Sequence, residues 1–224
     1  MNRYKKKVVL KEGASKFILQ FERPDRKKPD EQEVSNNNVQ IDSASKTILK
    51  NILNSSNPIE IEVGFGTGKF LIPYAEKHAN TNLLGLEITK KMVDHVANQV
   101  MDHKLPNVFI VHCDARFFLR ENIPEKSIDR IHVYFPDPWE KKRHIKRRVI
   151  NQDFLGIAHR ILKENGKLNL FTDHRDYFDY FLEQKELFGK FANDVDPGDY
   201  TPTSYETKWV RQGRIIYRAI LRKN

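Results

Sequence analysis

Residues 59–68 read Ile-Glu-Ile-Glu-Val-Gly-Phe-Gly-Thr-Gly, a short run rich in apolar side chains that leads directly into three closely spaced glycines. This pattern predicts a β-strand followed by a glycine-rich turn that opens a helix. Glycines at 64, 66 and 68 allow the backbone to turn sharply and to approach a ligand closely. The stretch therefore predicts a ligand-binding edge of an α/β sheet.

Strand-like and helix-like segments alternate outward from this stretch. The pattern predicts strands near 59–63, 82–87, 107–111, 128–135, 167–172 and 214–221, and helices near 41–53, 68–78, 90–103, 146–164 and 174–186. Alternation on this scale is typical of a doubly wound α/β sheet. The last strand follows no helix, so we expect it to enter the sheet antiparallel. Gly166 is expected just beyond the end of helix 146–164.

Acidic residues stand at the ends of the first three predicted strands of this alternation. Glu87 closes the second strand at the distance where a dinucleotide-binding fold holds ribose hydroxyls. The glycine spacing is G-x-G-x-G, however, and Glu62 would be unfavourable beside a pyrophosphate. A cationic ligand such as S-adenosylmethionine fits better, with Asp114 placed to accept a hydrogen bond from an adenine amino group. Each acid taken singly is also a common helix cap.

Residues 134–148 read Tyr-Phe-Pro-Asp-Pro-Trp-Glu-Lys-Lys-Arg-His-Ile-Lys-Arg-Arg, with six Lys or Arg in the last eight positions. Pro136 and Pro138 should end a strand and hold Asp137 stiffly at its carboxyl end. A rigid carboxylate beside a cationic run indicates a reaction site for a polyanion. The alternative is a turn followed by a solvated basic helix. Trp139 could stack on a base or pack against the sheet.

Composition narrows the class of partner. The 224 residues carry a net charge of +9, which favours nucleic acid or another anionic partner. Cys113 is the only cysteine, so an internal disulfide is impossible, and the apolar segments are too short for a membrane span of about 20 residues. These features predict a soluble, cytoplasmic protein. His132, His144 and His174 are not spaced as a metal-ligand set, and we expect no metal.

The distribution of charge and of strand and helix patterns divides the chain into two regions. Residues 1–40 contain ten basic residues in their first 28 positions and are expected to form a flexible N-terminal arm. That arm could wrap nucleic acid or could be a ragged terminus. Residues 41–224 are expected to form one α/β domain.

Four motifs together resemble the tRNA (guanine-N7-)-methyltransferases. They are the glycine loop at 62–68, the proline and basic stretch at 135–148, Phe-Thr-Asp at 171–173 and Thr-Ser-Tyr-Glu at 203–206. The resemblance spans about residues 58–221, and it implies that residues 41–224 form an S-adenosylmethionine-dependent methyltransferase domain. It implies a Rossmann-like class I methyltransferase fold, with a seven-stranded, mostly parallel sheet, an antiparallel last strand and helices on both faces. It also implies methyl transfer from S-adenosylmethionine to N7 of guanosine 46 in the variable loop of tRNA, by direct in-line displacement.

The resemblance also implies roles for individual residues. The expected cofactor contacts are Glu62, Gly64, Gly66, Glu87, Asp114, Ala115 and Asp137. The expected guanine or tRNA contacts are Lys141, Asp173, Thr203, Ser204, Tyr205 and Glu206, and further tRNA contacts are expected from Lys142, Arg143, Lys146, Arg147 and Arg148. Asp137 is the candidate catalytic residue. Asp173 could hold the guanine N1 and amino group, or could simply cap the following helix.

Two other classes of protein compete with this hypothesis. A non-catalytic RNA-binding protein could keep the fold without turnover, and a nicotinamide-dependent oxidoreductase could share the glycine loop. The three acidic strand ends argue against the first and the glycine spacing against the second. The sequence leaves open whether the protein acts as a monomer, as a homodimer or with a helper subunit, although a helper is not expected.

Overall fold

The structure is a computed structural model that describes residues 8–20, 42–196, 200, 202 and 204–224. Its strands are β1 (Ile18–Leu19), β2 (Ile59–Val63), β3 (Asn82–Glu87), β4 (Val108–His112), β5 (Ile128–Tyr134), β6 (Leu162–Thr172), β7 (Phe191–Asp194) and β8 (Tyr217–Lys223). Its α-helices are α1 (Ser43–Leu53), α2 (Leu71–Lys77), α3 (Lys90–Asp102), α4 (Ala115–Asn122), α5 (Gln152–Ile161), α6 (Arg175–Phe188) and α7 (Ser204–Arg211). Two 3-10 helices, η1 (Ala14–Phe17) and η2 (Lys142–Arg147), complete the described elements.

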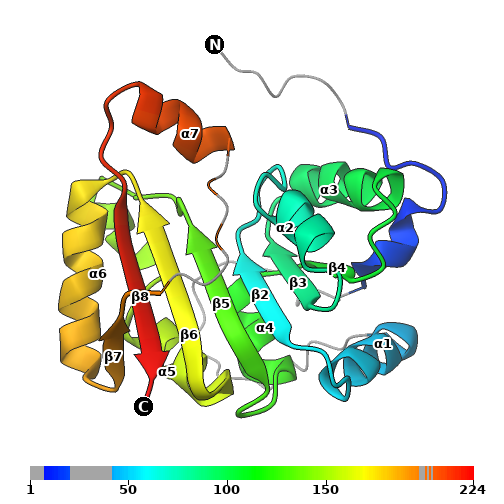
Figure 1. Ribbon diagram of the computed structural model, residues 1–224, viewed down its shortest axis with the longest axis horizontal. Coiled ribbons are helices and arrows are strands. Elements are labelled where there is room, and N and C mark those ends of the chain that lie inside the picture. The colour runs from blue at the N-terminus through cyan, green and yellow to red at the C-terminus, as the bar shows by residue number, and fades with distance from the viewer. Residues whose placement is uncertain (1–7, 21–41, 197–199, 201, 203) are drawn as a thin grey trace, which may run out of the picture.

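One sheet holds all eight of these strands, in the order β1-β4-β3-β2-β5-β6-β8-β7. Strands β1 to β6 run parallel, whereas β8 is antiparallel to both β6 and β7. The carboxyl ends of the parallel strands therefore meet at one edge, which lies at the top of Figure 1. Strand order reverses at β2, where β3 pairs on one side and β5 on the other, and this switch point is where ligands bind in open α/β sheets.

Helices cover both faces of the sheet. Helices α2 and α3 lie in front of it in Figure 1, and α4 and α5 lie behind it. One buried cluster joins the strands to the rear helices through Phe118 and Phe154, and a second joins them to η1, α2 and α3 through Ala14, Leu71 and Val96. β2 is buried along its whole length, and its residues Ile59, Ile61 and Val63 belong to the first cluster.

Local signals explain where several elements begin and end. Asp42 accepts a hydrogen bond from the backbone of Ser45 and starts α1, and Asn151 does the same for Phe154 and α5. Gly189 ends α6 in the left-handed conformation, with φ 68°. Gly85 lies in the middle of β3 because a Cβ there would come within 2.8 Å of Leu71 and Phe65. That close approach brings the glycine turn against the sheet.

The fold class is confirmed, with differences in detail. The sheet has eight described strands and not seven: the six strands located in the sequence overlap β2–β6 and β8, and β1 and β7 add short strands at the two edges. β1 lies within the region expected to be a flexible arm, and Leu19 is only 2% exposed. The rest of that arm, residues 1–7 and 21–40, lies outside the described residues. Helices α4 and α7 were not predicted.

The helix predicted near 146–164 is wrong at both ends. Helix α5 begins at Gln152, since the preceding basic residues form the separate 3-10 helix η2. The chain passes straight from Ile161 into β6, so Gly166 lies within a strand beside Asn165, whose φ is 63°. Helical periodicity continues across both boundaries and could not locate them. Among the described residues, no helix is long and apolar enough to cross a membrane.

Candidate active site

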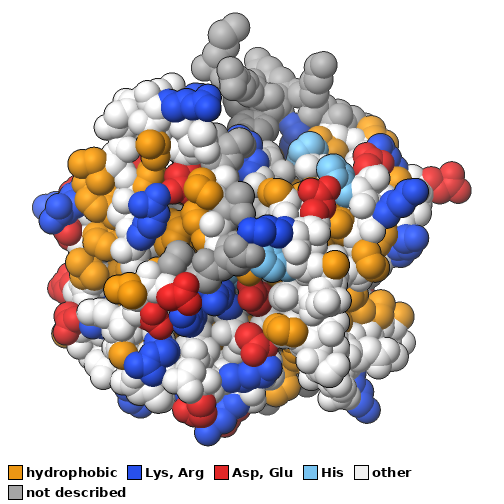
Figure 2. Space-filling model, viewed as in Figure 1, with side chains coloured by type: hydrophobic (Ala, Val, Ile, Leu, Met, Phe, Trp, Pro, Cys, Tyr) orange, Lys and Arg blue, Asp and Glu red, His pale blue; other side chains and the backbone are white. Residues whose placement is uncertain are grey.

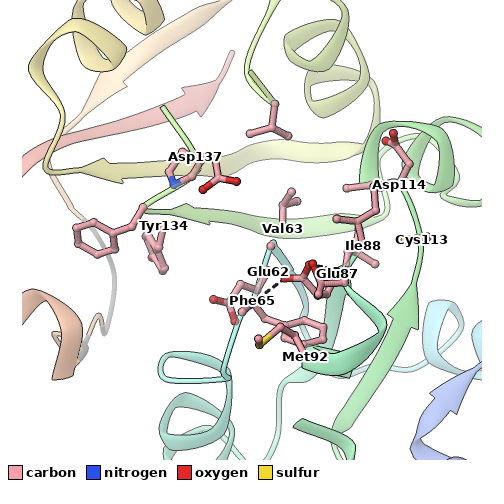
Figure 3. Close-up of a pocket in the computed structure, with 18 of the residues that line it drawn as sticks. Glu62, Val63, Phe65, Glu87, Ile88, Met92, Cys113, Asp114, Tyr134 and Asp137 are labelled. Carbon is pink, nitrogen blue, oxygen red and sulfur yellow. Dashed lines mark hydrogen bonds between the residues drawn. The ribbon is translucent and has the colours of Figure 1, made fainter. Parts of the chain in front are cut away.

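A cavity of about 640 Å³ opens at the carboxyl ends of β2, β3, β4 and β5. Its volume is in the range of small-molecule and cofactor sites. All seven residues expected to contact the cofactor line it: Glu62, Gly64, Gly66, Glu87, Asp114, Ala115 and Asp137. Figure 3 shows the acidic members of this set arriving from separate strand ends and facing the same space. The sheet topology thus brings together residues that are distant in the sequence.

The glycine loop between β2 and α2 forms one wall of the cavity. Gly64 and Gly66 have φ values of 77° and 53°, a region that other residues rarely adopt. A Cβ built on either of them would meet nothing within 4 Å, so the loop presents bare backbone to open space. Gly68, by contrast, sits 3.0 Å from Val96 at its Cβ position, which lets the loop pack closely on α3.

Glu62 is the most unusual side chain in the cavity. It is 4% exposed, and its Oε2 is buried without a hydrogen-bond partner among the described residues. Burial, together with the nearby charge of Glu87, raises the pKa of Glu62 to about 8. A buried carboxylate without a partner is costly unless a ligand supplies one. A cationic group bound in the cavity would do so.

Glu87 has a second function beyond facing the cavity. Its Oε2 accepts a hydrogen bond from the backbone N–H of Gly66 at 3.0 Å, and its Oε1 accepts one from Thr89 at 2.8 Å. The end of β3 therefore fixes the conformation of the glycine loop. Asp114 likewise caps α4, because its Oδ1 accepts from the backbone of Arg116 at 3.1 Å. Both carboxylates are held in place while still lining the cavity.

The proline loop after β5 forms the opposite part of the lining. Phe135 and Trp139 have positive φ values of 51° and 44°, which are unfavourable for aromatic residues and lie on either side of Asp137. Such strain concentrates at functional sites, where the surrounding structure maintains it. Asp137 is exposed and points to the cavity mouth (Figure 3).

Arg148 requires a correction to the expected tRNA contacts. It is only 5% exposed, and its Nε donates a hydrogen bond to the carbonyl oxygen of Pro138 at 2.9 Å. Its guanidinium also lies over the rings of Tyr177 and Tyr180, at 5.2 and 4.7 Å from their centroids. Arg148 therefore anchors the proline loop and is not available to a phosphate.

The other members of the basic run are exposed: Lys141, Lys142, Arg143, Lys146 and Arg147. Arg147 also lines the cavity, and its guanidinium lies 5.1 Å from the centre of the Trp139 ring. Trp139 is half-buried between this arginine and the cavity, with the edge of His144 at 5.7 Å. The tryptophan thus packs on the basic turn rather than in the core.

Of the expected guanine or tRNA contacts, Lys141, Asp173 and Glu206 are absent from the described lining of the cavity. Asp173 accepts a hydrogen bond from Nη1 of Arg214 at 2.9 Å, and its side chain is 17% exposed. It is not the cap of α6, since His174 occupies that position and accepts from the backbone of Tyr177. The helix-cap alternative for Asp173 is therefore wrong.

The Thr-Ser-Tyr-Glu motif is only partly described. Thr203 lies outside the described residues, and Ser204 and Tyr205 begin α7. Glu206 is 1% exposed and forms an ion pair with Arg218 and a hydrogen bond with the hydroxyl of Tyr200. In this arrangement Glu206 holds α7 against β8 rather than facing a nucleotide.

Sequence reasoning missed several residues of the cavity. Phe70, Met92 and Tyr134 provide apolar surface, and Ile88 lies 47% exposed directly after Glu87. An isoleucine directly after an acidic strand end is a sequence signal that could have predicted apolar lining at this position. The ring of Tyr200 packs on Phe70, Tyr134 and Phe171, which connects the cavity with the region of α7.

A buried hydrogen-bonded chain lies beneath Tyr134. Nε2 of His132 is 2.6 Å from Oε2 of Glu60, and Nδ1 of His132 is 2.7 Å from the hydroxyl of Tyr134. Burial lowers the pKa of His132 and so favours the neutral ring. Burial alone would raise the pKa of Glu60, but the hydrogen bond and charge of His132 together with the charge of Arg130 outweigh it, and the pKa of Glu60 is lowered. His132 is thus a positioned core residue. Among the described residues, no group of three or more His, Cys, Asp or Glu side chains is arranged to hold a metal ion.

A doubly wound sheet with this glycine loop and these acidic strand ends around one cavity has the fold of the class I methyltransferases. The fold is shared by the 16S rRNA methyltransferase KamB, with a TM-score of 0.58 at 12% identity over 84% of this chain and 97% of that one. The aminoglycoside resistance methyltransferase NpmB1 has a TM-score of 0.57 at 16% identity over 80% and 93%.

Sequence comparison narrows the class to a family. The family model described as "Putative methyltransferase" matches residues 56–219. A tRNA (guanine-N(7)-)-methyltransferase of Staphylococcus carnosus is 33% identical over 187 residues, which cover 80% of this chain and 88% of that protein. One of Streptococcus mutans is 34% identical over 174 residues, or 75% and 82%. The chain belongs to the tRNA (guanine-N(7)-)-methyltransferase family.

Proposed function

We propose that this protein methylates N7 of guanosine 46 in the variable loop of tRNA, with S-adenosylmethionine as donor and by direct in-line displacement. The observation that carries the proposal is the shared cavity, which places the buried Glu62 carboxylate and the exposed Asp137 on one lining beside a basic turn. The names of the relatives support tRNA and guanine N7 as the substrate.

The residues of the cavity fit the proposed donor. Glu62 offers a buried carboxylate to the cationic end of the ligand, and its Oε2 needs such a partner. The backbone of Gly64 and Gly66 leaves room for close approach, and Glu87 and Asp114 present carboxylates at the next two strand ends. We assign the ribose hydroxyls to Glu87 and the adenine amino group to Asp114.

S-adenosylmethionine supplies an electrophilic methyl group, which the N7 lone pair takes as the carbon–sulfur bond breaks and its electron pair stays on sulfur, leaving S-adenosylhomocysteine and a cationic 7-methylguanine. Guanine N7 carries no proton, so the protein needs no general base at this atom. Its contribution is to hold the two partners in line and to exclude competing geometries. Asp137, fixed by the two prolines and by Arg148, stabilises the positive charge that develops on the purine.

The exposed basic run provides the contact with RNA in this proposal. Lys141, Lys142, Arg143, Lys146 and Arg147 present five cationic side chains beside the cavity mouth. Contacts of this kind bind phosphates without regard to sequence and weaken steeply as salt rises. Asp173 is the proposed partner of guanine N1 and its amino group. Because the proposed substrate is tRNA, we expect the reaction to take place in the cytoplasm.

The direct test incubates the full chain with labelled S-adenosylmethionine and an unmodified tRNA transcript, followed by borohydride and aniline cleavage. We expect cleavage at guanosine 46, and none in a transcript that carries adenosine there. Label at another nucleotide would contradict the assigned position. Binding of S-adenosylmethionine without any transfer would favour the non-catalytic RNA-binding alternative, and a change in NADH fluorescence on mixing would favour the oxidoreductase.

A further inference from the structure

A second groove of about 750 Å³ lies between α2 and α7. Its lining includes Lys69 and Pro73 on the α2 side and Thr207, Lys208, Arg211 and Gln212 on the α7 side. Three of these side chains are cationic, and the described lining contains no carboxylate. Figure 1 shows α7 at the same edge of the molecule as the carboxyl ends of the parallel strands, and Figure 2 shows basic side chains on its outer surface.

The groove and the cavity of the active site share one lining residue. Lys69, at the end of the glycine loop, lines both. The two sites are therefore neighbours on the surface, with Lys69 at their common border. The basic run also borders the active-site cavity, because Arg147 lines it. Arg147 from the basic run and Lys69 from the groove thus both line the cavity.

The charges of α7 face outward without a counter-charge. Lys208 and Arg211 are exposed, and neither has a carboxylate within ion-pair distance among the described residues. They stand three residues apart and share one face of the helix. The opposite side of α7 is anchored, because Glu206 pairs with Arg218 and the Arg214 guanidinium lies 3.5 Å from the centre of the Trp209 ring. The helix thus holds its cationic face toward the groove.

We propose that this groove binds the sugar–phosphate backbone of the substrate RNA next to the target nucleotide, with Lys208 and Arg211 contacting phosphates. The inference rests on the proposed function, because it takes RNA as the substrate, and it adds a second phosphate-binding surface distinct from the basic run at 141–147. Cationic side chains with polar neighbours and no acid suit a polyanion, and Thr207 and Gln212 offer hydrogen bonds to phosphate oxygens.

The test compares the double variant K208Q/R211Q with the matched double variant K46Q/K50Q, which removes the same charge from exposed positions on α1. Filter binding of tRNA is measured without S-adenosylmethionine at salt concentrations from about 50 to about 300 mM. This range lies on both sides of the physiological ionic strength of about 150 mM. We expect K208Q/R211Q to bind tRNA about tenfold or more weakly, and its salt slope to fall by about 1.4 to 1.8, as for two lost phosphate contacts. K46Q/K50Q should keep the wild-type slope.

Two further measurements separate the explanations. Calorimetry should give both double variants the wild-type affinity for S-adenosylmethionine, which verifies folding, and the single variants K208Q and R211Q should each show about half of the slope change. tRNA binding by K208Q/R211Q within twofold of wild type would overturn the inference. So would a changed oligomeric state with unchanged RNA affinity, since the groove would then bind an acidic protein surface.

The outcome for the wild-type chain distinguishes the two proposals. If wild type modifies tRNA and the groove variant binds it normally, only the groove assignment fails. If wild type transfers no methyl group to tRNA but K208Q/R211Q still loses RNA binding, the groove assignment stands and the proposed reaction fails.

Discussion

The Nε of Arg148 donates a hydrogen bond to the carbonyl oxygen of Pro138 at 2.9 Å, and this contact ties the end of the basic turn to the loop that carries Asp137. Arg148 is buried against Tyr177 and Tyr180. The loop also contains two strained backbone positions, Phe135 and Trp139. The hydrogen bond therefore maintains a conformation that the backbone would not adopt by itself.

Replacement of Arg148 should impair turnover more than RNA binding. Arg148→Met removes the donor to Pro138, and loss of a hydrogen bond from a charged group costs about 1.5 to 3 kcal/mol. We expect kcat to fall at least tenfold, as Asp137 loses its fixed position, with KM for tRNA nearly unchanged. Arg147→Met is the matched control: that side chain is exposed, so KM should rise and kcat should be kept. Equal effects of the two substitutions would contradict this division.

Glu62 should couple ligand binding to a proton. Its pKa of about 8 means that it is mostly protonated near pH 7, and a bound cation would favour the ionised form. Binding of S-adenosylmethionine should therefore release up to one proton and become tighter as pH rises from 6 to 8. Calorimetry in buffers of different ionisation enthalpy measures the proton count. Glu62→Gln should bind at least tenfold more weakly and release no proton from this site.

The same residue should limit the stability of the ligand-free protein at high pH. The folded-state pKa of Glu62, about 8, is above its ordinary value of 4.5, so its contribution to stability is complete below pH 4.5 and is lost as pH rises through 8. Glu62→Gln should therefore unfold at a higher temperature than wild type at pH 9, and at a similar temperature at pH 5. A stability difference independent of pH would contradict the assigned burial.

Much of the fold was predictable from the sequence because its signals are local. The bounds of β2 and β3 match the predicted strands, since each is a short apolar run ended by a glycine or an acid. The gathering of Glu62, Glu87 and Asp114 at one edge follows from parallel strands alone. Their grouping could be predicted from the order of strands and helices alone, and the alternating sequence pattern gives that order.

Other features depend on contacts between distant segments and carry no local signal. Arg148 looks like its basic neighbours in sequence, and only the rings of Tyr177 and Tyr180 on α6 make it an anchor. Glu206 is buried because Arg218 on β8 reaches it. The two-residue strand β1 is too short to produce a period, and it forms because β4 leaves an open edge. Sequence patterns report on residues that are close along the chain, whereas these contacts join residues that are far apart in the sequence.

Asp173 and Arg214 should act as a coupled pair. The ion pair at 2.9 Å orients the carboxylate proposed to hold guanine. Asp173→Asn should lower kcat/KM for tRNA by about 100-fold, or about 2.7 kcal/mol, and Arg214→Gln by three- to tenfold. In the double variant the effects should be less than additive, because Arg214 acts through Asp173. Arg222→Gln removes the same charge from β8 without touching the Asp173–Arg214 pair, and it should leave kcat/KM near wild type. Full additivity would contradict the coupling.

Gly85 should be intolerant of a methyl group. A Cβ at this position would lie 2.8 Å from Leu71 and Phe65, and overpacking of this kind costs about 1 to 3 kcal/mol. Gly85→Ala should lower the free energy of unfolding in urea by that amount. It should also weaken S-adenosylmethionine binding, because Phe65 belongs to the glycine loop. Gly156→Ala is the control: its nearest neighbour is 3.9 Å away within a helix, so it should stabilise by about 0.5 to 1 kcal/mol.

Asp137 provides the most direct test of the proposed chemistry. It lines the cavity mouth, and no general base is needed at guanine N7, so its role is electrostatic. Asp137→Ala should abolish methyl transfer while tRNA affinity, measured by filter binding, stays largely intact. Asp137→Asn keeps the shape and removes the charge, so it should be nearly as inactive. Glu140→Gln changes an exposed carboxylate of the same loop outside the cavity, and its turnover should remain close to wild type. Near-normal single-turnover rates in Asp137→Ala would show that charge on the purine is stabilised elsewhere.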